Sequence, residues 1–124
     1  MRFLGKTTVA VAALMLAMPI AHARAADAAA GKAVYDKKCQ NCHGADGKGD
    51  PRNLPLYPRV DLTRSPMGAA KERILIHDRI SRGYTTMPGF QGKLKPEEIG
   101  RLVNKCIALA DPAGSAKDES KAGG

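Results

Sequence analysis

Apolar residues in this chain recur at the spacing of helices, and no stretch alternates as a half-buried strand would. Residues 26–41 are dominated by alanine and contain no proline. A narrow stripe at helical spacing within them is formed by Gly31, Val34, Tyr35 and Lys38. The pattern predicts a first helix over residues 26–41 that packs along this stripe.

Two later segments show the same periodicity. Residues 69–82 precede Gly83, which is suited to end a helix, and their apolar positions are Ile74, Leu75, Ile76 and Ile80. Residues 96–110 begin with a proline and two glutamates, which favour the first turn of a helix, and a proline at position 112 stops its continuation. The apolar set here is Ile99, Leu102, Val103, Cys106, Ile107 and Leu109. We predict helices over both segments.

The segments between the helices are long and irregular. Residues 44–58 contain three glycines and three prolines and are predicted to form no regular element. A short helical turn is expected over 61–63, and a second loop over 84–95. The fold class is therefore all-α, with three to four helices. Long loops in a compact domain need a reason, and a cofactor that they wrap is one.

The N-terminus has the features of an export signal. Arg2 and Lys6 precede an apolar run over residues 8–20, and the small-x-small sequence 21–23 follows. We predict a cleaved signal peptide over 1–23 and a periplasmic location. The run is shorter than the roughly 20 apolar residues that span a bilayer, so no membrane-spanning segment is expected in the mature chain. One domain should occupy 24–110, followed by a polar, disordered tail over 111–124.

The mature chain would be basic, because loss of Arg2 and Lys6 leaves eighteen basic against twelve acidic residues, a formal charge of +6. Nucleic acid is not favoured as the partner, since the chain has no nucleic-acid-binding motif and four aromatic residues remain for stacking. An acidic protein partner or an anionic surface fits the charge better. Solvation alone would also account for it.

The string Cys39-Gln40-Asn41-Cys42-His43 carries the chemistry. C-x-x-C-H is the pattern of c-type haem attachment. Cys39 and Cys42 are one helical turn apart and share a face, so both thiols can bond the vinyl groups on one haem edge. His43 can then bind the iron. We predict one covalent haem c held by these residues, which would also reinforce a core poor in large aliphatic side chains.

Three other readings of the cysteines are weaker. A thioredoxin-like redox pair needs a βαβ setting, which the helical pattern does not provide. A zinc site could recruit Cys39, Cys42, Cys106 and a histidine, but zinc sites rarely place histidine directly after the second cysteine. A disulfide between Cys39 and Cys42 would close a very short loop. Cys106 falls among apolar positions and reads as a buried small hydrophobe, with an intermolecular disulfide as the alternative.

Met87 is the predicted sixth ligand of the iron. It lies in the second loop beside Pro88 and Gly89, which fix the chain and let backbone pass close to a flat ligand. A helix separates it from His43, so the chain can reach the opposite haem face. Met67 and His77 are the competing candidates, and we expect His77 to lie at the surface or toward a propionate.

The chain from about Ala28 to Leu109 resembles the bacterial class I c-type cytochromes. The pieces that match are GKAVYDKKCQNCHGADGKGD, ISRGYTTMPGF and LKPEEIGRLVNKCIAL, in the family's order. The resemblance implies a small cytochrome c fold over 24–110, with the first and last helices crossing near Gly31. It also implies an exposed haem edge and a proline carbonyl, that of Pro55 or Pro58, that orients His43.

Two positions depart from the family. Lys105 stands where many relatives have an aromatic residue against the first helix, and Lys95 precedes Pro96 where serine or threonine would cap the helix. Both departures suggest a weaker pairing of these helices.

Histidine and methionine together would leave no open position on the iron, so we expect an electron carrier and not an enzyme. Redox partners would dock at the haem edge against basic side chains, for which the candidates are Lys37, Lys38, Lys48, Arg52 and Lys93. The alternatives are a haem c subunit of a larger periplasmic oxidoreductase and a haem-based sensor that releases Met87.

Overall fold

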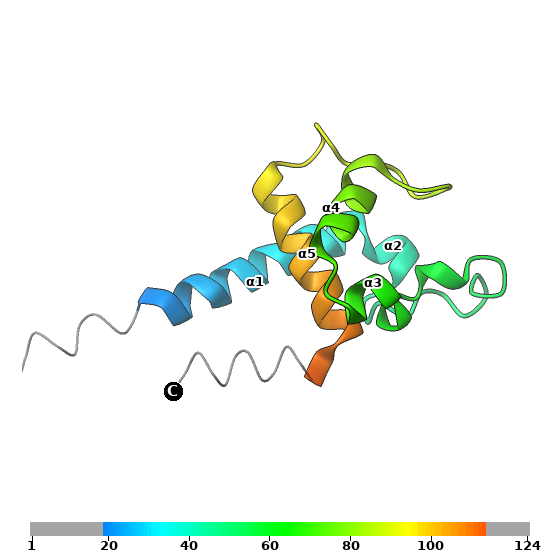
Figure 1. Ribbon diagram of the computed structural model, residues 1–124, viewed down its shortest axis with the longest axis horizontal. Helices are drawn as coiled ribbons and strands as arrows, with labels where there is room; N and C mark the ends of the chain where they lie inside the picture. Colours follow the sequence, from blue (N-terminus) through cyan, green and yellow to red (C-terminus); the bar gives the residue numbers. More distant parts are fainter. Residues whose placement is uncertain (1–18, 114–124) are drawn as a thin grey trace, which may run out of the picture.

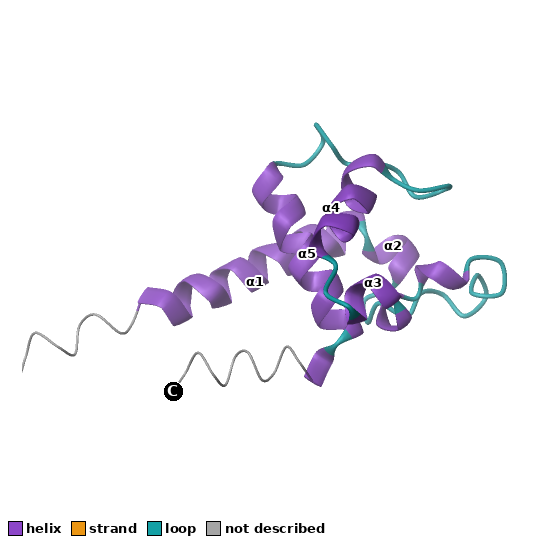
Figure 2. Cartoon of the chain, viewed as in Figure 1, coloured by secondary structure: helices purple, strands orange, loops and turns teal. Residues whose placement is uncertain are grey.

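The computed structural model describes residues 19–113, and within that range the chain forms helices joined by loops (Figures 1 and 2). The elements in order are α1 (Pro19–Lys38), α2 (Gln40–His43), the 3-10 turns η1 (Pro58–Val60) and η2 (Leu62–Arg64), α3 (Pro66–Ala69), α4 (Arg73–Arg82) and α5 (Pro96–Ala110). This confirms the all-α class. Residues 1–18 of the expected signal peptide and 114–124 of the expected tail lie outside the described range.

The first predicted helix is two helices. α1 ends at Lys38 and α2 begins at Gln40, with Cys39 between them at φ −118° and ψ −36°. The Cys39 amide still donates to the Tyr35 carbonyl at 2.8 Å, so the break is slight. α1 also begins earlier than predicted, at Pro19, and continues past Ala23. Cleavage after Ala23 would therefore remove its first residues and leave the helix from residue 24 to Lys38.

The second predicted helix begins later than expected. Pro66–Ala69 forms the separate short helix α3, with the Ser65 hydroxyl accepting from the Gly68 amide at 3.2 Å. Lys71 then adopts a φ of +55°, which a continuous right-handed helix does not allow, and α4 starts at Arg73. α4 ends as predicted, before Gly83 with a φ of +80°.

The prediction for α5 is confirmed at both ends. Lys95 supplies no side-chain cap, but the Glu98 carboxylate accepts a hydrogen bond from the Lys95 amide at 2.8 Å. One half of a capping box thus compensates for the missing serine or threonine.

Seven apolar side chains are buried and form one core: Tyr35, Ile76, Ile80, Phe90, Ile99, Leu102 and Val103. They come from α1, α4, α5 and the loop after α4, so the three long helices meet in one place. Lys38 is exposed and takes no part in the packing stripe that the sequence suggested.

α1 and α5 cross where Gly31 meets Arg101. A methyl group on Gly31 would lie 3.2 Å from Arg101 Cβ and 3.3 Å from its carbonyl oxygen. The Arg101 guanidinium also pairs with Asp27, one turn before Gly31. Farther along the same crossing the Lys105 ammonium lies 5.5 Å from the centre of the Tyr35 ring, a cation–π contact at the position where the resemblance led us to expect an aromatic residue.

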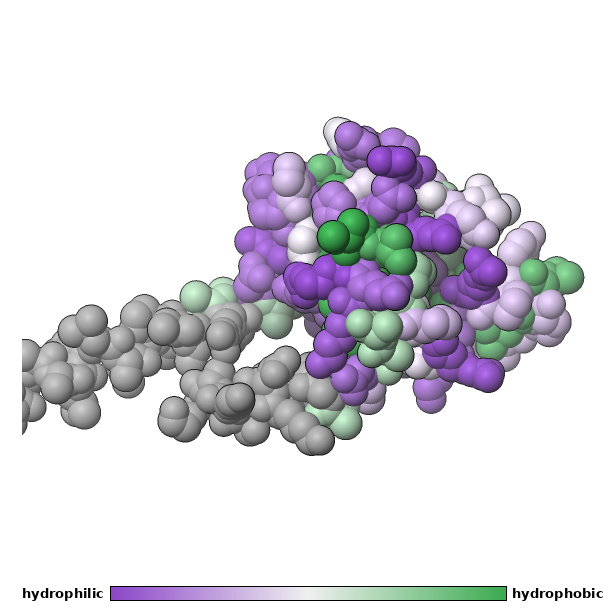
Figure 3. Space-filling model, in the orientation of Figure 1, coloured by the Kyte–Doolittle hydropathy of each residue, from purple (hydrophilic) through white to green (hydrophobic). Residues whose placement is uncertain are grey.

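The two long loops project on the same side of the molecule, with α2 between them in this view (Figure 1). Hydrophilic side chains cover most of the visible face, and hydrophobic side chains gather in a small group over the helices and again at the right-hand end of the molecule (Figure 3). The start of α4 contributes to the exposed apolar surface through Ile74, which is 85% exposed. No helix in residues 19–113 is both long and apolar enough to cross a membrane.

Replacing Gly31 by valine should destabilise the protein, because the added methyl groups meet the backbone carbonyl of Arg101. We expect a loss of about 1–3 kcal/mol in the free energy of unfolding, measured by denaturant titration. Gly100→Ala is the control, since a methyl group there meets nothing within 4 Å. It should be neutral or stabilising by up to about 1 kcal/mol. Equal effects of the two changes would contradict a close crossing at Gly31.

Candidate functional site

Cys39, Cys42 and His43 occupy one turn at the junction of α1 and α2. The amides of Cys42 and His43 both donate to the Cys39 carbonyl, at 3.2 and 3.0 Å. This turn places the two sulfurs and the imidazole on one short, rigid segment. Cys39 is half-buried against the core, whereas Cys42 is exposed.

The His43 ring is held by a backbone carbonyl. Its Nδ1 lies 2.8 Å from the carbonyl oxygen of Val60, at the end of η1. Because a carbonyl only accepts, Nδ1 carries the proton and the Nε2 lone pair stays free. The expectation that Pro55 or Pro58 holds this ring is wrong. The chain turns through η1 after Pro58, and this turn brings the carbonyl two residues later to the histidine.

The backbone around His43 is fixed by a second set of contacts. The buried Tyr35 hydroxyl donates to the Gly44 carbonyl at 2.7 Å, and the Gly49 amide donates to the His43 carbonyl at 2.8 Å. Burial raises the pKa of Tyr35 well above its ordinary value, so the phenol remains a donor. A methyl group on Gly49 would lie 2.8 Å from Val60 Cγ2, so this turn and η1 are in close contact.

Before a haem is attached, two half-buried thiols, those of Cys39 and Cys106, are held in the protonated form. Burial raises the pKa of Cys39 to about 11, and the neighbouring Cys42 contributes. Burial raises the pKa of Cys106 to about 12, with a smaller contribution from Cys39. Cys106 packs against the core, as its place among apolar positions indicated, and none of the three cysteines forms a disulfide. No group of three or more potential metal-binding side chains gathers within residues 19–113.

Met87 lies in a tight turn beyond α4. The Tyr84 amide donates to the Met87 carbonyl at 3.0 Å, and the Met87 amide returns a bond to the Tyr84 carbonyl at 2.9 Å. Thr85, inside the turn, has a φ of +51°, which costs a β-branched residue on the order of 1–2 kcal/mol. The Met87 side chain is half-buried against the core.

The ends of this loop are fastened by close backbone packing. The Phe90 and Gln91 amides donate to the Ile80 and Ser81 carbonyls, both at 3.0 Å, so the chain returns to the end of α4. A methyl group on Gly89 would lie 2.7 Å from the Ser81 carbonyl oxygen, and one on Gly83 would clash with the Met87 carbonyl. Only glycine allows the loop to close this tightly.

The two competing ligand candidates lie elsewhere. Met67 is also half-buried against the core, but it belongs to α3. Gly68, the residue that follows it in α3, packs on Ala110 of α5. His77 is exposed on α4, and its Nδ1 lies 3.3 Å from the Ser81 hydroxyl.

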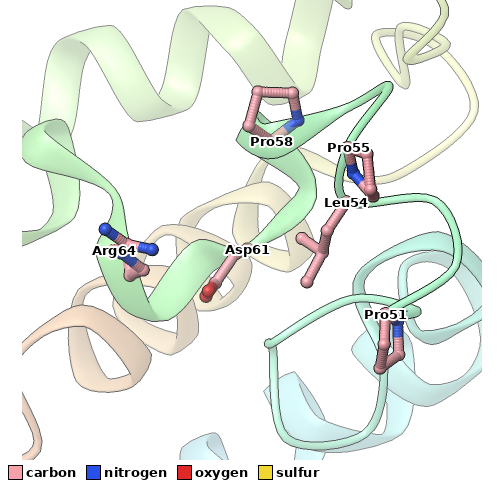
Figure 4. Close-up of a pocket in the computed structure, with 6 residues that line it drawn as sticks. All are labelled: Pro51, Leu54, Pro55, Pro58, Asp61 and Arg64. Atoms are coloured by element: carbon pink, nitrogen blue, oxygen red, sulfur yellow. The ribbon is translucent and has the colours of Figure 1, made fainter.

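A hollow of about 540 Å³ opens in the first loop, lined by Pro51, Leu54, Pro55, Pro58, Asp61 and Arg64 (Figure 4). The Leu54 side chain extends into it. Two of its lining residues, Pro58 and Asp61, lie on either side of the segment 59–60, and the Val60 carbonyl in this segment contacts the His43 ring. The Asp61 carboxylate accepts from the Thr63 amide at 3.0 Å and so caps η2. The prolines on this loop therefore form an apolar wall next to the support of the histidine.

The donor set fits a covalently bound haem. Two thiols one turn apart, an imidazole with its Nε2 free and a thioether in a fixed turn are the groups that haem c attachment and axial ligation need. The half-buried apolar residues around the core include Cys39 and Met87, so a flat apolar group lying against both would extend that core.

Known proteins of one kind are similar to this chain. The family model for cytochrome c oxidase, cbb3-type, subunit III matches residues 26–104. A cytochrome c6 of Nostoc sp. is 32% identical over 89 residues, which is 72% of this chain and 77% of the relative. A cytochrome c6 of Rippkaea orientalis is 33% identical over 99 residues, 80% of this chain and 83% of the relative. No solved structure matches the chain.

The chain belongs to the class I c-type cytochromes with a single haem. It has the small all-α cytochrome c fold, and its cofactor is a covalently bound haem c. Its general function is electron transport. The resemblance that the three sequence segments indicated is thereby confirmed.

The sequence did not reveal the residues that support the site. Tyr35 could have been found, because it lies two helical turns before His43 on the packing stripe. Val60 could not, since it acts through a carbonyl that every residue possesses. The backbone hydrogen bonds between Tyr84 and Met87 could have been suspected, because Gly83 and Gly89 enclose a segment short enough to form a tight turn.

Cys106 should resist alkylation in the folded holoprotein. Burial raises its pKa to about 12, so at pH 8 only about one thiol in 10⁴ is ionised, and thiolate is the reactive form. We expect iodoacetamide to label it at least about 100-fold more slowly than in the unfolded chain. Cys106 leaves the free energy of unfolding unchanged below about pH 9, where both states hold the proton, and lowers it as the pH rises from 9 toward 12, because the unfolded chain ionises first. Rapid labelling of the folded protein at pH 8, or a dimer that a reductant dissolves, would contradict a buried thiol.

Proposed function

We propose that this protein is an exported one-electron carrier in which Cys39 and Cys42 attach the haem and His43 and Met87 bind its iron. The bond between His43 Nδ1 and the Val60 carbonyl supports this most directly, because it fixes the tautomer that leaves Nε2 free to bind a metal. A ring without such a partner could turn and present either nitrogen.

Each part of the site would then have a defined task. The haem supplies an iron that cycles between Fe(III) and Fe(II). Val60 and the Tyr35 hydroxyl hold the histidine segment still during that cycle. The thioether of Met87 favours the reduced iron and would raise the reduction potential. Because both axial positions are filled by the protein, no substrate has direct access to the metal, and the protein is a carrier and not an enzyme.

Partners would meet a basic surface, and we propose that they are acidic redox proteins of the periplasm. Lys37 and Lys38 are exposed at the end of α1, directly before Cys39. Arg52 is a weaker docking candidate than the sequence suggested, because its guanidinium pairs with Asp50 at 2.6 Å. The other candidates form no ion pair with a carboxylate of the described residues, so their charges are available to a partner. They are Lys37, Lys38, Lys48 and Lys93.

A second function is favoured by the family match. The matching family model describes a subunit of an oxidase, over residues 26–104. The same haem site would then pass electrons inside a stable complex. Purification of the native protein at moderate salt separates the cases, since a mobile carrier elutes alone and a subunit elutes with its assembly.

Replacing Met87 by alanine tests the proposed ligand. The oxidised protein should lose the weak thioether-to-iron absorption band completely, the reduction potential should fall, and carbon monoxide should bind the reduced iron. Met87→His should keep the iron six-coordinate at a lowered potential. Absorption spectra and a redox titration measure all of these effects.

Met67→Ala is the matched control, because Met67 is a second half-buried thioether against the same core. It should cost stability but leave the band and the potential intact. The reverse pattern, with the band lost in Met67→Ala alone, would show that Met67 and not Met87 binds the iron.

Electron exchange with an acidic partner should slow as salt rises. Steering between opposite charges is screened over about 8–10 Å at 0.1–0.15 M, and we expect the bimolecular rate to fall on the order of tenfold between low and high salt. Lys38→Gln should weaken this dependence more than Lys71→Gln, because Lys71 lies beyond α3 and its ammonium already pairs with the Asp111 carboxylate at 3.6 Å. A rate independent of salt would mean that the basic side chains serve solubility alone.

A further inference from the structure

Two arginines converge on one exposed tyrosine between the long loops. The Arg59 guanidinium donates to the Tyr84 hydroxyl at 3.1 Å. The Arg79 guanidinium carbon lies 3.6 Å from the centre of the same ring, and that of Arg59 at 5.5 Å. Neither arginine forms an ion pair with a carboxylate in the part of the chain described, so Tyr84 is a principal partner of both.

Both residues of the Arg59–Tyr84 hydrogen bond are connected directly to the supports of the proposed iron ligands. Arg59 directly precedes Val60, whose carbonyl holds the His43 ring at 2.8 Å. The Tyr84 backbone exchanges two hydrogen bonds with Met87, at 3.0 and 2.9 Å. A continuous series of contacts therefore runs from His43 to Met87, and the bond between the Arg59 and Tyr84 side chains is its central link. That bond joins the two loops that project on the same side of the molecule (Figure 1).

We propose that Arg59 and Tyr84 form a latch that positions Met87 on the iron. The proposal rests on the axial roles of His43 and Met87 proposed above. The latch ties the loop that carries Met87 to the loop that supports His43, so the two ligands cannot move apart independently. Arg79 packs on the face of the ring and keeps the hydroxyl aimed at Arg59.

The turn that carries Met87 needs such a restraint. Thr85 has a φ of +51°, a conformation that threonine rarely adopts, so the turn itself favours opening. The tight packing at Gly83 and Gly89 anchors the ends of the loop, but it does not hold the turn against the first loop. The latch supplies that contact.

The test is the rate at which Met87 leaves the iron in the intact, oxidised holoprotein. Cyanide added in excess binds at a limiting rate set by dissociation of the native ligand, and stopped-flow absorbance follows it. Tyr84→Phe removes one hydroxyl and keeps the ring on Arg79. We expect the limiting rate to rise about 3- to 10-fold, the scale of the net contribution of a typical hydrogen bond, because Tyr84 is exposed and water replaces part of the lost contact. Arg59→Gln should give a similar rise, and Arg59→Lys should restore part of the slow rate.

Tyr57→Phe is the matched control. Tyr57 lies on the first loop and is 48% exposed, close to the 42% of Tyr84, but within the described residues its hydroxyl forms no hydrogen bond with Arg59 or the Met87 loop. Its limiting rate should equal that of the unsubstituted protein. The thioether-to-iron band should persist in every variant, because the latch acts through the turn and not on the metal.

The outcomes separate the latch from the ligand assignment. Rates within twofold of the unsubstituted protein in both Tyr84→Phe and Arg59→Gln, with the band intact, would overturn the latch alone. Absence of the band in the unsubstituted protein would overturn the Met87 ligand and the latch together. An equal acceleration in Tyr57→Phe would also overturn the latch, since any loop change would then have the same effect.

Discussion

The crossing of α1 over α5 at Gly31 is the contact on which the rest of this small fold depends. It lets two helix backbones approach to van der Waals distance, and the close approach buries Tyr35 and brings Cys39 against the core. Tyr35 then fixes the carbonyl after His43. The position of the haem-binding turn is thus set by a residue without a side chain, twelve positions before His43.

The sequence predicted what depends on side-chain pattern. The periodicity located α5 at both ends and the end of α4, and the C-x-x-C-H string identified the cofactor. It missed what depends on backbone geometry. Lys71 at positive φ splits α3 from α4, and no feature of lysine announces that conformation. The carbonyl that holds His43 was assigned to a proline because family resemblance suggested one, whereas the chain uses Val60.

The departures from the family are offset by local contacts. Lys95 cannot cap α5 through its side chain, and Glu98 bonds to its amide instead. Lys105 lacks the ring of an aromatic residue, but its ammonium lies over the face of Tyr35 and keeps an attractive contact at the helix crossing. A cation over a ring retains part of the interaction that two rings would make, and it adds a positive charge beside the site.

The support of His43 by a main-chain carbonyl has a consequence for how this family can vary. Since the bond needs no particular side chain at position 60, natural selection can accept many residues there as long as η1 keeps its course. The side chain at 60 is constrained from a different direction, because Val60 Cγ2 would meet any Cβ placed on Gly49 at 2.8 Å. The coupling therefore runs in one direction: a branched residue at 60 requires glycine at 49, whereas a small residue at 60 would leave only the φ of +76° at Gly49 to favour glycine there.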